Sequence, residues 1–288
     1  MPDSKQADPK QSLTSAPAPE AKQGLTSAPA PEAPALTVPG TGLTYGSYLQ
    51  LDQLLALQQP RSSPAEHDEM LFIVIHQVYE LWFKQVLHEL GHLEQGFAAG
   101  RTAAVLGTFK RILTILKTLV AQVDVLETMT PVEFGSFRSR LESASGFQSQ
   151  QFRLIEVRLG KRDPRMLAYL QQPGGDPRAK QQLEQALAQP PLYPRFLHFL
   201  ASQGIQLGDD PRPALIDIYR HHPVLAAVCE RMVDLDEGLQ EWRYRHVKMV
   251  ERTIGLKRGT GGSAGAEYLR TTLAEPLFPD LWAIRSEL

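Results

Sequence analysis

The stretch from Leu225 to Thr253, LAAVCERMVDLDEGLQEWRYRHVKMVERT, repeats mostly apolar side chains at alternating steps of three and four residues. That spacing puts every member on one face of an α-helix, so it predicts a long helix with one buried stripe. One member of the stripe, His246, can bind a metal or a proton. The full stripe is Leu225, Val228, Met232, Leu235, Leu239, Trp242, His246, Met249 and Thr253.

A second stretch, FIVIHQVYELWFKQVLHEL from Phe72 to Leu90, has the same spacing and again includes one histidine, His76. Burying an imidazole is costly unless a partner satisfies its nitrogen atoms. Helical bundles commonly place metals and cofactors between facing helices. The two histidines therefore predict a site between two core helices. The second stripe is Phe72, His76, Tyr79, Phe83, Val86 and Leu90.

The chain from Leu43 onward is helical in pattern almost throughout, and we find no convincing period-two alternation of the kind that strands show. This predicts an all-α fold, a helical bundle. A third stripe lies between the two histidine stretches and predicts another core helix. Its members are Val105, Phe109, Ile112, Leu116, Leu119, Val123 and Leu126.

Local signals predict where several helices begin and end. Ser63–Glu66 and Thr130–Glu133 match capping boxes with proline at the first helical position, which predicts helices from there to about Phe97 and to about Leu141. A helix is expected to begin after Gly46, and the long histidine helix is expected to span Pro223 to about Gly255. The last expected helical stretch carries Leu269, Leu273, Leu277 and Leu281.

Composition narrows the class of protein. The formal charge of −2 argues against nucleic acid or an anionic membrane as the main partner, and 42% hydrophobic residues suffice for a sizeable core. The single cysteine, Cys229, excludes an intramolecular disulfide and fits a reducing compartment; we expect a buried thiol there. No apolar run is long enough to span a bilayer and no signal peptide begins the chain, so we expect a cytoplasmic protein.

The first 41 residues differ from the rest. They contain the repeat KQSLTSAPAPEA from Lys10 and KQGLTSAPAPEA from Lys22. Such an Ala/Pro/Ser/Glu composition buries too little apolar area to offset chain entropy. We therefore expect a disordered tail over residues 1–41 and one all-α domain over residues 42–288.

Three further patterns bear on chemistry. His88–His92 reads HELGH and matches the zinc motif H-E-x-x-H, but the sequence offers no suitable third ligand, so we weigh against a zinc peptidase. The glycine-rich loop Gly255–Gly265 is either a flexible connection or a site for a carboxylate or ammonium group. Arg138 stands beside aromatic residues and is either half of a surface ion pair or a clamp on a substrate carboxylate.

Four blocks of the chain, in this order, resemble the haem-dependent tryptophan 2,3-dioxygenases. They are LTYGSYLQLDQLL from Leu43, EHDEMLFIVIHQVYELWFKQVLHEL from Glu66, FRSRLESASGFQSQQFRLIE from Phe137, and EWRYRHVKMVERTIGLKRGTGGSAGAEYLR from Glu241. The resemblance implies a haem site between core helices and cleavage of the indole C2–C3 bond of L-tryptophan by O2, giving N-formyl-L-kynurenine.

The resemblance also implies residue roles. His246 matches the axial ligand of the haem b iron, with Trp242, Ser145 and Gly146 as further haem-side residues. His76 matches the distal catalytic residue that faces the indole N–H, and Arg138 and Thr260 match residues that hold the zwitterionic end of the amino acid. Phe72, Phe134 and Leu49 match residues that enclose the indole ring.

Tyr45 and Tyr48 match a segment that completes the site of a neighbouring subunit, which implies a homotetramer built as a dimer of dimers. Phe134, Val123 and Gln150 depart from residues found in some relatives, so the resemblance leaves open a substituted indole as substrate. A haem monooxygenase that inserts one oxygen atom into an indole remains an alternative within the enzymes. A catalytically idle haem-binding or haem-sensing protein is the alternative from a different class.

Overall fold

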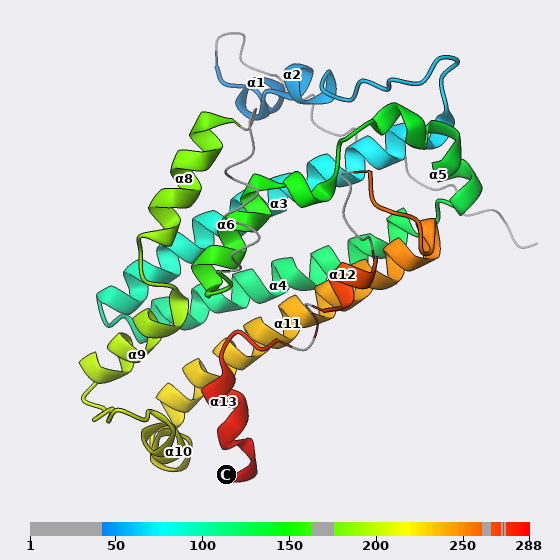
Figure 1. The fold of residues 1–288 in the computed structure, drawn as a ribbon. Helices are drawn as coiled ribbons and strands as arrows, with labels where there is room; N and C mark the ends of the chain where they lie inside the picture. The colour runs from blue at the N-terminus through cyan, green and yellow to red at the C-terminus, as the bar shows by residue number, and fades with distance from the viewer. Residues whose placement is uncertain (1–41, 163–175, 261–265, 272, 274) are drawn as a thin grey trace, which may run out of the picture. The chain divides into compact units, whose positions relative to one another are not determined.

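The structure, a computed structural model, describes residues 42–162, 176–260, 266–271, 273 and 275–288 (Figure 1). These residues form helices and connecting segments without any strand, so the all-α prediction is confirmed. The chain divides into two units, one up to Asp52 and one from Gln53 to Leu288, and each is described by itself. The predicted tail over residues 1–41 lies outside the described residues, and the single domain over residues 42–288 stays a prediction.

The amino-terminal unit holds helix α1 (Tyr45–Leu49), and α2 (Leu51–Leu55) follows it. The single helix expected to begin after Gly46 is wrong in two respects. Thr44 caps α1 two residues earlier, because its hydroxyl accepts the Ser47 N–H and the Ser47 hydroxyl accepts the Thr44 N–H. Gln50 then adopts a left-handed conformation, φ 55°, which ends α1 and separates it from α2.

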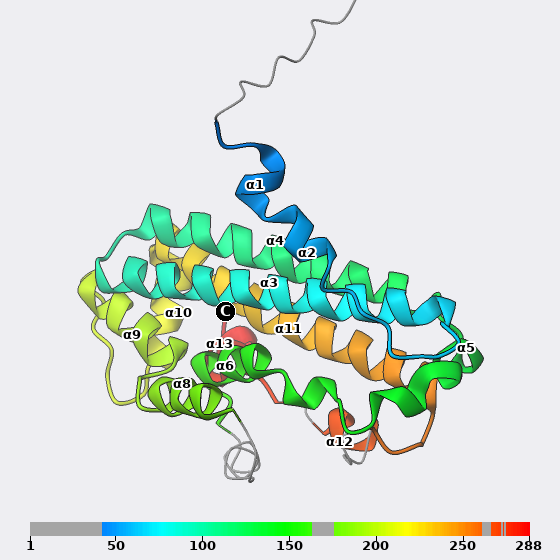
Figure 2. The ribbon, with the colours of Figure 1, turned by 90° about the horizontal axis from the view of Figure 1, so that it is seen from above.

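Three long helices form the core of the larger unit: α3 (His67–Ala98), α4 (Thr102–Leu126) and α11 (Pro223–Ile254). Helix α4 packs against both α3 and α11, and the three run side by side in Figures 1 and 2. The α4 stripe predicted from Val105 to Leu126 is buried throughout. Glycine permits a close approach at Gly238 of α11, where a Cβ would lie 3.2 Å from Cδ1 of Leu116 on α4.

The two histidine stripes are each buried at one end and become half-buried where the histidines lie. On α11 every member from Leu225 to Trp242 is buried, whereas His246 and the members after it keep some accessible surface. On α3 the members from Phe83 onward are buried, whereas Phe72 and His76 are not fully so. The core is therefore closely packed toward the carboxyl end of α3 and the amino end of α11, whereas the region around the two histidines is only half-buried.

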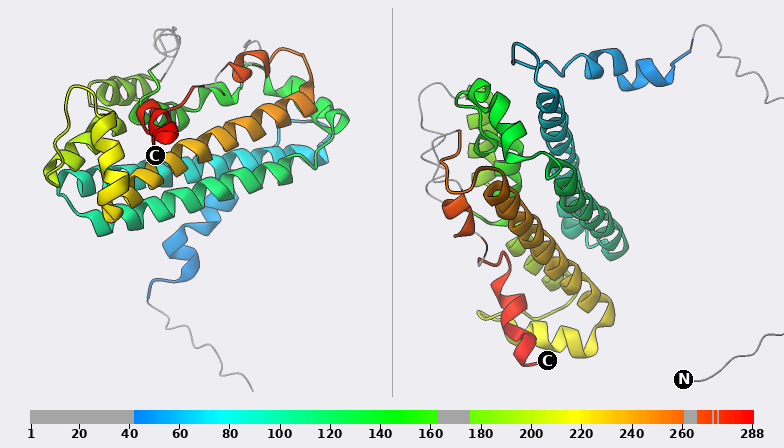
Figure 3. Two further views of the ribbon diagram at one scale, coloured as in Figure 1. Left: turned by 90° about the horizontal axis from the view of Figure 1, so that it is seen from below. Right: turned by 90° about the vertical axis from the view of Figure 1, so that its right-hand side faces the viewer.

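Shorter elements complete the fold. Helix α6 packs against α3, α8 and α9, while α10 and α13 pack against α11 (Figure 3). The predicted capping box at Thr130 is confirmed, since its hydroxyl accepts the Glu133 N–H at 3.3 Å. The remaining elements are α5 (Pro131–Phe137), η1 (Arg138–Leu141), η2 (Gly146–Gln148), α6 (Gln150–Leu159), α8 (Pro177–Leu187), α9 (Leu192–Ser202), α10 (Arg212–His221), α12 (Ala266–Arg270), α13 (Pro279–Ala283) and η3 (Ile284–Ser286).

The capping box predicted at Ser63–Glu66 is wrong, because α3 begins at His67 with Glu66 as its N-cap. The Ser62 hydroxyl accepts the Glu66 N–H instead. Further along α3, the buried Glu69 carboxylate accepts the backbone N–H groups of Arg61 and Ser62 at 2.6 and 2.9 Å. These contacts fix the preceding segment in a non-helical course, so the pattern at Ser63 does not start a helix.

The continuous helix expected through Leu269 and Leu281 is also wrong, because two short helices, α12 and α13, stand in its place. Pro276 and Pro279 interrupt the helical pattern between them. The fully buried Asp236 of α11 accepts the backbone N–H groups of Leu277 and Phe278 there. A third donor, the indole N–H of Trp282, reaches the same carboxylate oxygen at 2.9 Å.

Two other expectations can be checked. Cys229 is fully buried, as predicted, and burial raises the pKa of its thiol to about 12. None of the helices in the described ranges has the length and apolar character that crossing a membrane requires.

Candidate functional site

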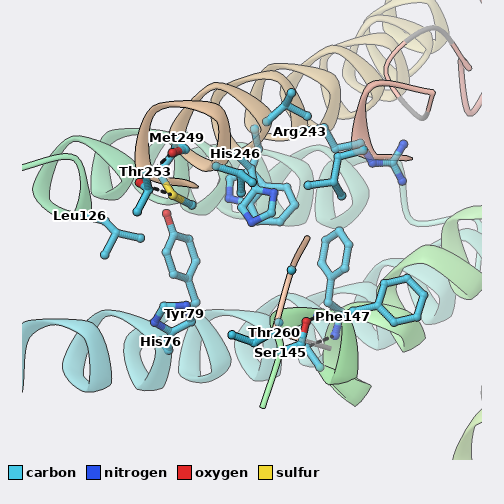
Figure 4. Close-up of a pocket in the computed structure, with 18 of the residues that line it drawn as sticks. His76, Tyr79, Leu126, Ser145, Phe147, Arg243, His246, Met249, Thr253 and Thr260 are labelled. Carbon is cyan, nitrogen blue, oxygen red and sulfur yellow. Dashed lines mark hydrogen bonds between the residues drawn. The ribbon is translucent and has the colours of Figure 1, made fainter. Parts of the chain in front are cut away.

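A cavity of about 290 Å³ lies between α3 and α11, where the core is hollow. The segment from α5 to α6 and the residues that follow α11 contribute further walls. Figure 4 shows His76 and Tyr79 rising from α3 and His246, Met249 and Thr253 reaching in from α11. Nine of the residues predicted from sequence line this one cavity: Phe72, His76, Phe134, Arg138, Ser145, Gly146, Trp242, His246 and Thr260.

His76 has a defined tautomer. Its Nδ1 lies 2.7 Å from the backbone carbonyl oxygen of Phe72, one turn earlier in α3. A carbonyl oxygen can only accept, so Nδ1 carries the proton and Nε2 of the neutral ring keeps a lone pair. Burial lowers the pKa of the His76 imidazole below its usual value, although the Phe72 carbonyl and the Glu80 carboxylate oppose that shift. The side chain is therefore a neutral hydrogen-bond acceptor at neutral pH.

His246 is also held neutral. Burial lowers the pKa of its imidazole to about 4, and the nearby His76 adds to the effect. Part of its surface is nevertheless accessible, because the ring lines the cavity. A neutral imidazole with an accessible ring at a cavity is the form of histidine that binds metals. His246 thus has the chemistry of a ligand.

An aromatic wall supports His246. The Trp242 ring stacks on the His246 ring with centroids 5.4 Å apart and planes 16° from parallel. Trp242 in turn contacts Phe152 of α6 at 4.8 Å and meets Phe83 of α3 edge to face at 6.0 Å. These contacts explain why Trp242 is buried although it borders the cavity, and they fix the orientation of its ring.

Arg138 and Thr260 come together at one side of the cavity through two hydrogen bonds between distant segments. Nη2 of Arg138 donates to the carbonyl oxygen of Arg258 at 2.6 Å, and the Thr260 hydroxyl donates to the carbonyl oxygen of Ala144. Nε of Arg138 is buried and has no hydrogen-bond partner among the described residues. Buried donors are nearly always paired, so this N–H is a candidate donor to a bound ligand.

A further wall of the cavity, which includes Arg138, is largely aromatic. Phe72 lies against His76 with ring centroids 4.1 Å apart and against Phe134 at 5.7 Å. Phe137 packs behind both rings. The cavity therefore offers an aromatic surface beside a guanidinium, a combination that suits an aromatic amino acid.

Three predicted site residues belong to the amino-terminal unit. Leu49, Tyr45 and Tyr48 lie on α1, and all three side chains are exposed. Their predicted roles stay predictions. The loop Gly255–Gly265 is described only up to Thr260, and its remaining residues lie outside the described part of the chain.

Several charged residues of the cavity carry no role in the sequence analysis. Glu80 of α3, Arg153 and Glu156 of α6, and Arg243 of α11 all line it. On α6 the sequence held a signal for these residues. Phe152, Arg153 and Glu156 recur at helical steps on one face, together with the N-cap Ser149. Arg243 precedes His246 by three residues and so shares its side of α11.

Tyr79 belongs to the predicted stripe but had no assigned role. Its hydroxyl donates to the carbonyl oxygen of Leu119 on α4 at 2.9 Å. Burial raises the pKa of Tyr79 to about 12, so the phenol stays protonated and keeps this link between α3 and α4.

The H-E-x-x-H pattern has a structural explanation. Glu89 is buried and pairs with Arg111 of α4 at 3.1 Å, whereas His88 and His92 are exposed. Within the described ranges no cluster of three or more His, Cys, Asp or Glu side chains could hold a metal ion. In this structure the glutamate of the pattern thus forms an interhelical ion pair.

Comparison with known proteins agrees with this geometry. The sequence profile of the family described as tryptophan 2,3-dioxygenase matches residues 30–200 and 210–288. The chain belongs to the tryptophan 2,3-dioxygenase family. Relatives that carry this name in Anaeromyxobacter sp. strain K and Anaeromyxobacter dehalogenans strain 2CP-C are each 60% identical over 260 residues, which cover 85% of this chain and 96% of the relative. A relative with the same name in Herpetosiphon aurantiacus is 57% identical over 261 residues, 85% of this chain and 98% of the relative.

The resemblance stated from four sequence blocks is thus confirmed at the level of the family, and with it the prediction of an oxidoreductase. The individual residue roles are not tested by these comparisons. That nine of the predicted site residues line one cavity is a property of this chain itself.

Proposed function

We propose that the chain is a haem-dependent dioxygenase that cleaves the indole C2–C3 bond of L-tryptophan with O2 to give N-formyl-L-kynurenine, the first step of tryptophan breakdown by this route. The observation that carries the proposal is the pairing of two neutral histidines from α3 and α11 across a cavity that also holds Arg138 and Thr260. A haem binder without an amino-acid substrate would not need the second pair.

The donor set fits haem b. His246 is a neutral, accessible imidazole, and the walls beside it are aromatic and aliphatic, as a porphyrin requires. We assign His246 as the residue that would bind the haem iron, Trp242 as the ring that packs beside His246, and Ser145 and Gly146 as further residues that would line the haem side. When bound, the haem would supply the iron chemistry that activates O2 for insertion of both atoms.

Arg138 and Thr260 would hold the zwitterionic end of the substrate. The unpaired Nε–H of Arg138 can donate to the substrate carboxylate, and its bond to the Arg258 carbonyl keeps the guanidinium in place before substrate binds. The Thr260 hydroxyl is brought to the same side by Ala144. Fixing one end of the substrate reduces the freedom of its indole ring, which is how positioning lowers a barrier.

The indole ring would lie against Phe72 and Phe134. Leu49 is assigned to the same site from the sequence resemblance alone. Nε2 of His76 would accept a hydrogen bond from the indole N–H, since its Nδ1 is already used on the Phe72 carbonyl. In this role His76 orients the ring and responds to charge on the indole nitrogen. It need not remove the proton fully.

The quaternary assignment follows from the same resemblance. Tyr45 and Tyr48 are large side chains that remain exposed on α1, which supports a role in completing the site of a neighbouring subunit in a homotetramer. A cytoplasmic location accords with the single buried cysteine and is part of the proposal.

Labelled oxygen tests the reaction directly. Purified protein loaded with haem and reduced without oxygen is mixed with L-tryptophan and labelled O2, and the product mass is measured. A product with both labelled atoms supports the dioxygenase. One labelled atom points to the monooxygenase alternative, and haem binding without any product points to a haem-binding or haem-sensing protein.

A further inference from the structure

A buried triad of charged residues joins α6 to α11 beside the cavity. The two carboxylate oxygens of Glu156 accept from different arginines: Oε1 from Nη2 of Arg243 at 3.0 Å, and Oε2 from Nη1 of Arg153. The side chains of Glu156 and Arg243 are each only 5% exposed. With both oxygens in use and little water present, the triad has one well-defined arrangement.

The triad lies next to the turn of α11 that carries His246. Arg243 directly follows Trp242 and precedes His246 by three residues. Trp242 stacks on His246 and contacts Phe152, which lies one turn before Glu156 on α6. Two side-chain links therefore connect α6 with this turn, one ionic and one aromatic. Both fix residues adjacent to the imidazole.

We propose that Glu156, acting through Arg243, is a positioning residue for His246. The ion pair holds the α11 turn at a set distance from α6, and this keeps the Trp242 ring stacked on the imidazole. Groups that orient a metal ligand commonly tune the metal almost as strongly as the ligand itself. The proposal rests on the proposed function, in which His246 binds the haem iron.

A stabilising ion pair with no effect on His246 is the competing explanation, and Glu89 provides the matched control. Its side chain is 3% exposed and pairs with Arg111 of α4 at 3.1 Å, so it is buried to a similar degree and also links two helices. Glu89 does not line the cavity. Glu89→Gln therefore removes an equivalent charge far from the histidine.

The test uses the full chain loaded with haem. The resonance Raman band of the iron–histidine stretch in the ferrous protein and the rate of haem transfer to apomyoglobin are measured for Glu156→Gln and Glu89→Gln. We expect Glu156→Gln to shift the band and to release haem roughly tenfold faster, while Glu89→Gln matches the unmodified protein in both. The proposal is overturned if Glu156→Gln leaves the band and the release rate unchanged.

Variants of Arg243 test the same ion pair from its other side, so the result does not depend on Glu156→Gln alone. If Glu156 acts through Arg243, then Arg243→Gln and the double variant Glu156→Gln/Arg243→Gln shift the band no further than Glu156→Gln alone. Arg243→Gln breaks the same ion pair from the other side, so its band decides the matter if Glu156→Gln does not fold. Arg243→Lys keeps the charge and is expected to retain most of the native band. An additive double variant contradicts the proposal. Loss of the iron–histidine band in His246→Ala separates this outcome from a failure of the proposed function, because a retained band there would overturn both.

Discussion

Nδ1 of His76 donates its proton to the carbonyl oxygen of Phe72, 2.7 Å away in the preceding turn of α3. This one contact determines what the side chain can do in the cavity, because it leaves Nε2 as an acceptor. The two rings also pack closely in a tilted arrangement, with centroids 4.1 Å apart and planes 37° from parallel. The helix backbone, rather than another side chain, thus prepares His76 for an indole N–H.

The pH dependence of turnover follows from this state of His76. Its folded-state pKa lies below the ordinary value of 6.5, chiefly through burial, so the neutral form persists where an exposed histidine would protonate. We expect kcat/KM to hold steady as the pH falls to about 6.5 and to drop only below it, when Nε2 gains a proton and stops accepting. A pH profile of the haem-loaded enzyme measures this. The drop is expected to vanish from the profile of His76→Ala, whose overall activity is lower.

Arg138→Ala is expected to raise KM for L-tryptophan by about tenfold or more, because a hydrogen bond to a charged group contributes about 1.5–3 kcal/mol. A decrease in kcat as well would mean that the guanidinium also sets the position of the ring. Steady-state kinetics of the haem-loaded variant provide the measurement. Arg140→Ala is the control, since Arg140 lies in the same short helix η1, is exposed, and does not line the cavity. Equal kinetics for both variants would contradict the assignment.

Much of the fold could be predicted because its core consists of regular stripes. Periodic apolar side chains mark a face that is buried throughout on α4 and buried from Leu225 to Trp242 on α11, and a periodic pattern needs no knowledge of the partner helix. Helix boundaries failed where distant contacts decide them. The Glu69 carboxylate accepts the backbone N–H groups of Arg61 and Ser62 before α3. The Asp236 carboxylate accepts those of Leu277 and Phe278 before α13, and no local sequence pattern indicates either set of hydrogen bonds.

Some residues of the site could likewise be predicted from the sequence, and others could not. Histidines and aromatic residues on the stripes were identified because a polar ring on an apolar face is unusual. Glu156 and Arg243 were missed because a charged residue on a helix is usually solvent-exposed, and only the packing of α6 beside α11 shows that these two are buried together. Arg138 and Thr260 were paired through resemblance, and the structure supplies the physical reason, the hydrogen bonds to Arg258 and Ala144.

Asp236→Ala is expected to lower the free energy of unfolding by about 3–5 kcal/mol, because one buried and two partly buried N–H donors lose their fully buried acceptor at once. Those donors belong to Leu277, Phe278 and Trp282, so the segment before α13 and its first turn would loosen first. Urea unfolding followed by circular dichroism measures the loss. Asp234→Ala serves as the comparison, since its partly exposed pair with Arg231 on the same helix is expected to contribute under about 1 kcal/mol. A similar decrease in the free energy of unfolding in both variants would contradict the prediction that the Asp236 hydrogen bonds stabilise the fold more than the Asp234 ion pair does.

His246→Ala is expected to abolish the native haem spectrum, because no other neutral histidine of α11 faces the cavity and an alanine offers the iron no ligand. The absorption spectrum of the reduced protein, recorded after loading with haem, provides the measurement. His92→Ala is the matched control: it removes an imidazole from an exposed position on α3 and is expected to leave the spectrum unchanged. His76→Ala is expected to keep the native haem spectrum while turnover falls. If His76→Ala lost the haem and His246→Ala retained it, the ligand and the distal residue would be exchanged between α3 and α11.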